Sequence, residues 1–112
     1  MVCPYSFGER GGVQSHVLGL AGWLGRAGHQ VDILGPGTPD PGWLESYGIA
    51  PEQLTSLGAA MAVPYNGSVA RLTFGPATSA RVRRWLDESH PDVLHVHEPI
   101  TPSASVLALW PR

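Results

Sequence analysis

The sequence predicts an α/β fold built on a short parallel sheet, and three observations lead to that prediction. Apolar residues keep helical spacing over 12–27. Short stretches with strand character lie on both sides of that helix, at 1–3 and 30–34, and a third lies at 92–97. The order strand, helix, strand is the unit from which parallel sheets are made. Three strands are fewer than a doubly wound half contains, so we expect a partial Rossmann-like sheet.

The first strand and helix are the best marked elements. Pro4 stops the short strand at 1–3, and Gly11-Gly12 opens the helix. Gly28 stands where a left-handed residue would end that helix. The helix should face the core with its apolar stripe, which consists of Val13, Val17, Leu20, Ala21 and Leu24.

The middle of the chain is rich in proline and glycine. We expect a surface loop over 35–42 and a short helix over 51–57. A short strand is expected at 60–63, followed by a turn at 64–67.

Two more helices are predicted in the last third of the chain. Proline suits the first turn of a helix, so one helix should run from Pro76 to Ser89 with Val82, Trp85 and Leu86 facing inward. Another should cover 103–109.

Length and composition limit the classes of function. The 112 residues suffice for one small domain, and a charged fraction of 14% with a net charge of −2 argues against disorder and against a nucleic-acid partner. Cys3 is the single cysteine, so a reducing cytoplasm is the expected compartment. Since no apolar stretch reaches the roughly 20 residues that span a bilayer, membrane contact should be peripheral.

The first candidate site is the loop from Tyr5 to Gly12. Ligands gather beyond the carboxyl ends of parallel strands, where helix N-termini favour anions. Gly11 and Gly12 would let a phosphate approach backbone N–H groups, but the pair alone is a weak signal and is more often a plain tight turn. Gln14 and His16 project from the first turns of the same helix.

The second candidate follows the strand at 92–97. His95 and His97 share one face of this strand, and Glu98 comes directly after it. These three side chains could ligate a metal, but without an evident further ligand nearby we expect no metal. His97 and Glu98 are better read as residues that line a site.

The third candidate is the run from Tyr65 to Arg71, which also contains Asn66 and Ser68. It combines an aromatic ring, an amide, a hydroxyl and a guanidinium that could bind a phosphate. The alternative is a turn in which Asn66-Gly67 supplies permissive backbone angles.

The fourth candidate is the basic run Arg81, Arg83 and Arg84, followed by Trp85. Each arginine near an anionic membrane contributes about 1 kcal/mol of attraction. Alternatively, Arg83 and Arg84 could each pair with the acidic residue four positions on, which would make this an ordinary solvated helix face.

Several of these runs together resemble the N-terminal domain of the phosphatidylinositol mannosyltransferases of mycobacteria and related actinobacteria, which are retaining glycosyltransferases of GT-B fold. The run from Tyr65 to Arg71 is the most specific of them, whereas glycine pairs and His-Glu-Pro occur across many GT-B enzymes. The matching runs are 1–7, 11–17, 64–72, 74–78 and 92–99 without Val96.

The resemblance implies an activity for the parent enzyme. Mannose would pass from GDP-mannose to the inositol of phosphatidylinositol, with retention, in phosphatidylinositol mannoside synthesis at the cytoplasmic face of the plasma membrane. The resemblance implies no tightly bound cofactor, and it leaves the need for a divalent metal open. The 112 residues would form part of the acceptor-side domain, and the nucleotide-sugar domain would lie outside them, so we expect this chain alone to be inactive.

The resemblance also implies roles for the candidate residues. Gly11 and Gly12 would lie at the donor diphosphate, and Arg81, Arg83 and Arg84 would contact an anionic membrane. No catalytic residue is expected within these 112 residues. The acceptor would be seated by six residues, which are Tyr5, Gln14, Tyr65, Asn66, Ser68 and Arg71.

Three departures from the family pattern leave other functions open. Ile100 replaces an asparagine of the acceptor pocket, Thr73 replaces an arginine, and Ala80 removes a basic position. A GT-B transferase with another donor or acceptor is one alternative. A flavodoxin-like binding module without catalytic activity is another.

Overall fold

The computed structural model shows a mixed α/β fold and describes residues 1–59, 61–65, 68–72, 75–98 and 103–109. The helices are α1 (Gly12–Arg26), α2 (Pro41–Ser46), α3 (Pro76–Ser89) and α4 (Ala104–Leu109), with a 3-10 turn at Pro51–Gln53. The strands are β1 (Ile33–Gly35), β2 (Leu54–Ser56), β3 (Met61–Tyr65) and β4 (Ser68–Leu72).

The central strands run parallel. β1 pairs with β2, and Ile33 lies opposite Leu54. Val2 forms parallel bridges to Leu34 on one side and to Val96 on the other. The spatial order is therefore Val96, Val2, β1, β2, which in chain order is 4-1-2-3. The same order read from the other edge, 3-2-1-4, begins the doubly wound sheets that bind nucleotides.

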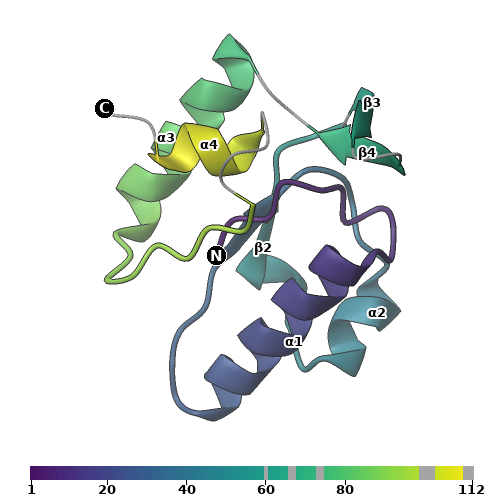
Figure 1. The fold of residues 1–112 in the computed structure, drawn as a ribbon. Helices are drawn as coiled ribbons and strands as arrows, with labels where there is room; N and C mark the ends of the chain where they lie inside the picture. The colour runs from purple at the N-terminus through teal and green to yellow at the C-terminus, as the bar shows by residue number, and fades with distance from the viewer. Residues whose placement is uncertain (60, 66–67, 73–74, 99–102, 110–112) are drawn as a thin grey trace.

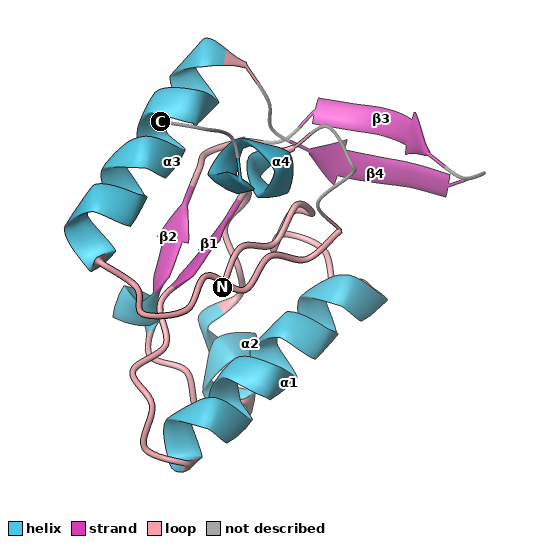
Figure 2. Ribbon diagram, turned by 60° about the vertical axis from the view of Figure 1, so that its left-hand side comes forward, coloured by secondary structure: helices cyan, strands magenta, loops and turns pink. Residues whose placement is uncertain are grey.

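Helices cover both faces of this sheet. α1 and α2 lie on one face, and α3 and α4 lie on the other (Figures 1 and 2). Met1 and Cys3 belong to the apolar cluster under α1 and α2, whereas Val2 belongs to the cluster under α3 and α4. Successive residues of a strand point to opposite faces, so three residues at the start of the chain contribute to both halves of the core.

The two long helices agree with the sequence prediction. Val17 and Ala21 are buried on α1, and Gly28 takes a left-handed φ of 98° just beyond its end. α3 spans Pro76–Ser89, the predicted range, and its inward side chains are buried as expected. The apolar spacing was a reliable guide here because both helices bury one stripe against the sheet.

The surface loop predicted over 35–42 is wrong in two respects. Gly35 ends β1 and is buried together with Pro36, and α2 begins at Pro41. The Asp40 carboxylate caps this helix by accepting from the Gly42 N–H at 3.2 Å. An Asp-Pro pair is a helix start as well as a loop signal, and the buried Trp43 and Leu44 decide in favour of the helix.

The helix predicted over 51–57 is also wrong beyond its first turn. Only Pro51–Gln53 is helical, and β2 follows directly. The Gln53 amide donates to the carbonyl of Val31 at 3.1 Å and so ties this turn to the segment before β1. Pairing with β1 satisfies the backbone of β2, and this tertiary contact overrides local propensity.

The predicted strand at 60–63 and turn at 64–67 become an antiparallel hairpin. Tyr65 of β3 lies opposite Ser68 of β4, so Pro64 and Tyr65 belong to a strand where a turn was expected. Met61–Val63 is strand as predicted, while Ala60 lies outside the described residues. β4 was not predicted. The hairpin stands on the side of the molecule where the loop before α1 lies (Figures 1 and 2).

The second and the last of the three predicted central strands are shorter than predicted. The strand expected at 30–34 is Ile33–Gly35, and within 92–97 only Val96 makes a bridge, to Val2. Leu94 and Val96 pack on the core cluster under α3 and α4 and so alternate along the chain with His95 and His97.

Candidate functional site

The candidate site lies where the segments at Val2 and Val96 end. Val2 leads into the loop before α1, whereas Val96 leads to His97 and Glu98. These two neighbouring strands are the place where the strand order reverses, because β1 and β2 extend the sheet on one side of Val2 and Val96 extends it on the other. In open parallel sheets, the crevice beyond this reversal is the usual ligand site.

Tyr5 and Glu98 meet at this edge of the sheet. The Tyr5 hydroxyl donates a hydrogen bond to Oε2 of Glu98. Glu98 adopts a φ of 48°, a left-handed conformation that costs a non-glycine residue free energy. Two residues 93 positions apart are thus joined at a strained backbone position, a combination that clusters at functional sites.

Three imidazole rings stand beside this pair. His95 stacks on His97 with ring centroids 4.5 Å apart, and His16 of α1 meets the His97 ring edge-on at 5.6 Å. Burial first, and then the neighbouring His95 and His16, lower the pKa of His97 to about 4. Nε2 of His97 is buried and makes no hydrogen bond within the described structure. His97 is therefore a neutral ring near pH 7.

The alternative of a metal site at His95, His97 and Glu98 is not supported by the arrangement of these side chains. Among the residues that the structure describes, no group of three or more His, Cys, Asp or Glu side chains is arranged to hold a metal ion. His97 therefore presents a polar ring that is neutral near pH 7 at this edge of the sheet.

Cys3 lies next to the loop before α1, and its thiol is chemically inert. Its side chain is fully buried, and Sγ lies 3.5 Å from the carbonyl oxygen of Tyr5. Burial raises the pKa of the Cys3 thiol to about 12, so no thiolate forms near neutral pH.

The glycine pair at the start of α1 has two distinct environments. A Cβ on Gly11 would lie 2.4 Å from Oε1 of Gln14, whereas a Cβ on Gly12 would meet nothing within 4 Å. Gln14 is buried, and its amide donates to the carbonyl of Ser6 at 3.0 Å. Gln14 therefore holds the loop, and Gly12 is the exposed glycine at the helix start, where unpaired N–H groups favour an anion.

The run from Tyr65 to Arg71 can be placed only by its backbone. Tyr65 ends β3, Ser68 begins β4, and Arg71 lies opposite Ala62. Asn66 lies outside the described residues, as do Thr73 and Ile100. The acceptor roles of these residues stay predictions.

The basic run on α3 divides into two parts. Arg81 donates from Nη1 to the carbonyl oxygen of Leu57 at 2.7 Å, which ties the helix to the end of β2. Arg83 and Arg84 are exposed on the same helix. Trp85 is 8% exposed and belongs to the core, so its proposed help in membrane contact is wrong.

A cavity of about 510 Å³ opens at the opposite edge of the sheet. Its walls include Met1, Asp32, Trp85 and His95, which stand at the amino ends of strands or on the helix above them. This cavity is the alternative position for a binding site. The carboxyl edge is the better candidate, because helix N-termini point their N–H groups toward it.

The sequence analysis missed three residues next to the candidate site. Arg10 pairs with Asp40 at 3.0 Å and lies over the ring of Trp43, 5.4 Å from its centroid. Asp40-Pro41 is an N-terminal helix signal that could have predicted α2. Nothing in the sequence pattern joins Arg10 to α2, since 30 positions separate Arg10 from Asp40.

Comparison with known proteins identifies the family. The model of Glycosyltransferase Family 4 matches residues 10–112, which is most of the chain. The chain belongs to Glycosyltransferase Family 4. The match includes α1, both strands of the parallel pair and the His97-Glu98 segment, whereas Val2 and Tyr5 lie before its first residue.

The resemblance to phosphatidylinositol mannosyltransferases is confirmed by individual relatives of this family 4 chain. It is 54% identical over 97% of its length to the phosphatidyl-myo-inositol mannosyltransferase of Mycolicibacterium smegmatis, of which it covers 26%. The proteins of the same name from Mycobacterium tuberculosis and Propionibacterium freudenreichii are 51% and 49% identical over 97% and 98% of the chain. The chain covers 27% and 29% of these two relatives.

Proposed function

We propose that the complete protein transfers mannose from GDP-mannose to the inositol of phosphatidylinositol with retention. In this proposal the 112 residues are the front part of the acceptor-side, Rossmann-like domain of a GT-B enzyme, and the nucleotide-sugar domain lies outside them. The observation that carries the proposal is the identity of about half of all positions, along nearly the whole chain, to phosphatidyl-myo-inositol mannosyltransferases of three genera.

The geometry of the crevice supports a donor diphosphate at the start of α1. Gly12 is exposed, a Cβ there would meet nothing within 4 Å, and Gly12 begins the first turn of a 15-residue helix. Backbone N–H groups at such a position bind phosphates without a basic side chain. The diphosphate would lie between this helix start and the neutral wall formed by His97.

The acceptor would lie beside the diphosphate, toward the β3–β4 hairpin. Tyr5 and Glu98 border that side, and their hydrogen bond would orient the phenol ring against the inositol. Tyr65, Asn66, Ser68 and Arg71 would complete the pocket, and Arg71 would bind the lipid phosphate through its guanidinium. Gln14 would act on the acceptor through the loop that it holds at Ser6.

The complete enzyme tests the activity directly. Purified protein is incubated with radiolabelled GDP-mannose and vesicles that contain phosphatidylinositol, and the lipid fraction is analysed for a mannosylated product. Reactions with UDP-glucose, or with vesicles that lack phosphatidylinositol, are the controls. Transfer to a different acceptor or from a different donor would favour the second candidate, another family 4 transferase, which the replacements at Thr73 and Ile100 suggest.

We further propose that α3 rests on the cytoplasmic face of the membrane with Arg83 and Arg84. No helix in the described ranges is long and apolar enough to cross a bilayer. Both arginines are exposed, whereas Arg81 is partly engaged with the carbonyl of Leu57.

The contribution of each arginine is measured by the binding of single variants of the complete protein to vesicles. Replacing Arg83 or Arg84 with glutamine should weaken binding to anionic vesicles about fivefold each, the equivalent of about 1 kcal/mol per charge. Arg26→Gln, at the end of α1, is the matched control with the same change of charge. Equal loss of binding in all three variants would show a general charge effect and count against a membrane face on α3.

A further inference from the structure

The loop that leads into α1 is held near Phe7 by its backbone and near the helix start by the side chain of Arg10. Phe7 is buried, and its N–H donates to the carbonyl of Pro36 at 2.9 Å. The Ser6 carbonyl accepts the Gln14 amide. The following residues, from Gly8 to Arg10, are exposed, and the Arg10 side chain reaches across to α2.

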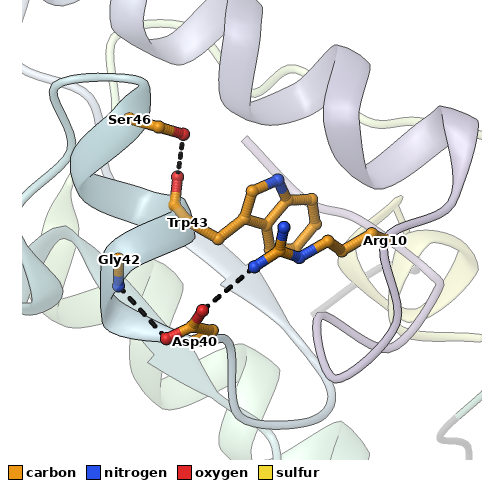
Figure 3. Close-up of polar contacts among 5 residues, drawn as sticks. All are labelled: Arg10, Asp40, Gly42, Trp43 and Ser46. Carbon is orange, nitrogen blue, oxygen red and sulfur yellow. Dashed lines mark hydrogen bonds and ion pairs between the residues drawn. The ribbon is translucent and has the colours of Figure 1, made fainter.

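Arg10 makes two contacts of different kinds with α2 (Figure 3). Its Nη2 lies 3.0 Å from Oδ2 of Asp40, and its guanidinium lies over the indole of Trp43. An ion pair and a cation–π contact together fix both the position and the plane of a guanidinium. A flexible arginine with about three-fifths of its side chain exposed is thereby held in one orientation.

The partners of Arg10 are themselves fixed. Asp40 uses its other oxygen to cap α2 at the Gly42 N–H, and Trp43 is 7% exposed within the core cluster (Figure 3). α2 packs closely on α1. The distance shows at Gly22 of α1, where a Cβ would lie 2.2 Å from the carbonyl oxygen of Tyr47, the residue that follows α2. Arg10 therefore joins the loop to a block in which α1 and α2 cannot shift independently.

We propose that Arg10 is a positioning residue for the glycine pair, a role that rests on the proposed donor site at Gly12. Arg10 directly precedes Gly11, so its attachment to Asp40 and Trp43 sets the direction in which the chain enters α1. The N–H groups at the helix start are thereby held in place for a diphosphate before it arrives. Pre-ordering of this kind raises affinity by lowering the entropy that binding must remove.

The competing role for Arg10 is direct contact with the diphosphate. The two roles predict opposite effects of Asp40. If Arg10 acts through Asp40, loss of the Asp40 charge should weaken donor binding as loss of Arg10 does. If Arg10 binds the phosphate itself, release from Asp40 should leave donor binding unchanged or strengthen it, because the carboxylate competes for the same guanidinium.

The experiment is a double-mutant cycle in the complete enzyme, with Arg10→Ala, Asp40→Asn and the combined variant. Asparagine keeps a side-chain oxygen for the cap at Gly42, so Asp40→Asn removes the ion pair without removing the helix start. Arg10→Lys keeps the charge but loses the planar contact with Trp43. Two measurements are made on each variant. The first compares the change in KM for GDP-mannose with the change in kcat. The second is the rate of hydrogen exchange at the amides of Phe7, Gly8 and Glu9.

These amides report the loop itself, since each donates a hydrogen bond in the structure. We expect both single variants to raise the KM about two- to fivefold, the range of an exposed pair, with a smaller change in kcat. Exchange at Gly8 and Glu9 should accelerate by a similar factor, while Phe7 changes less. The combined variant should be no worse than either single one, and Arg10→Lys should be intermediate.

Three results would overturn the positioning role. They are unchanged exchange at Gly8 and Glu9 in Arg10→Ala, a KM in Asp40→Asn at or below the wild-type value, or additive effects in the combined variant. The exchange measurement needs no substrate. Failure of the enzyme to use GDP-mannose would therefore be visible separately from failure of Arg10 to order the loop.

Discussion

Gly11 and Gly12 are adjacent glycines whose lack of a side chain serves different purposes. Gly11 leaves room for Gln14, which occupies the space where a Cβ would be and holds Ser6. Gly12 faces open space at the helix start. The first glycine is therefore required by packing within the protein, and the second is available to a ligand.

Substitutions at these two positions should separate stability from donor binding. Gly11→Ala should lower the free energy of unfolding by about 1 kcal/mol, because Gln14 must move and release the Ser6 carbonyl. Gly12→Asp should leave stability unchanged or raise it by about 0.3–1 kcal/mol, since a carboxylate suits a helix N-terminus, yet it should repel the diphosphate. Denaturant unfolding and the KM for GDP-mannose measure the two effects. A Gly12→Asp enzyme with an unchanged KM would contradict the proposed donor site.

At the scale of elements, the contact between α1 and α2 depends on Gly22. A Cβ there would lie 2.2 Å from a backbone oxygen of Tyr47, and backbone atoms cannot move aside as a flexible side chain can. Trp43 and Tyr47 of the α2 region meet edge-to-face at 6.4 Å and pack on the core under α1. The short helix α2 is thus held by packing, as its six residues would not be stable alone.

Gly22→Ala and Gly25→Ala form a matched pair on α1. Gly22→Ala should destabilise the protein by about 1–3 kcal/mol, because α2 must separate from α1. Gly25 has nothing within 4 Å of its Cβ position, so Gly25→Ala should stabilise the helix by about 0.5–1 kcal/mol. Thermal unfolding of both variants measures the difference. Equal melting temperatures would mean that the two helices do not pack as closely as described.

At the scale of the whole molecule, helices on both faces of the sheet bury the strands and leave polar groups at their carboxyl ends. Among these polar groups, His97 is the one whose pKa links this arrangement to the pH dependence of stability. It lies between strand and helix, stacked on His95, and burial lowers its pKa to about 4 from the ordinary 6.5. The folded protein therefore takes up this proton at a lower pH than the unfolded chain does.

The stability of the protein should decline in acid because of His97. Above about pH 6.5 both states leave His97 neutral, so its contribution to stability is complete. As the pH falls toward about 4, only the unfolded chain is protonated, and the free energy of unfolding decreases. His97→Gln should flatten this part of the profile, whereas the same change at the exposed His29 should not. Urea unfolding at a series of pH values is the measurement, and an equal slope in wild type and His97→Gln would argue against the half-buried neutral ring.

The local sequence pattern was sufficient to predict an element wherever that element carried one clear signal, such as an apolar stripe. α1 and α3 follow from their apolar stripes and from the glycine or proline at their starts, because each helix buries one side against a sheet. The α/β class follows from strand–helix order. The rule that parallel sheets bind ligands at their carboxyl ends selects the loop from Tyr5 to Gly12 and the residues His97 and Glu98 as candidates, and their roles stay predictions. The family follows from the motifs and is confirmed by the matched residues 10–112.

Contacts between distant segments decided what the sequence could not. β2 exists because it pairs with β1, against a local preference for a helical turn, and α2 forms because its Asp40 cap and buried Trp43 outweigh a loop-like composition. The hydrogen bond from Tyr5 to Glu98 joins residues 93 positions apart, and the ion pair of Arg10 with Asp40 joins residues 30 positions apart. Sequence periodicity reports which face of an element is apolar, but it carries no information on which surfaces meet, so partners of this kind appear only once the chain has folded.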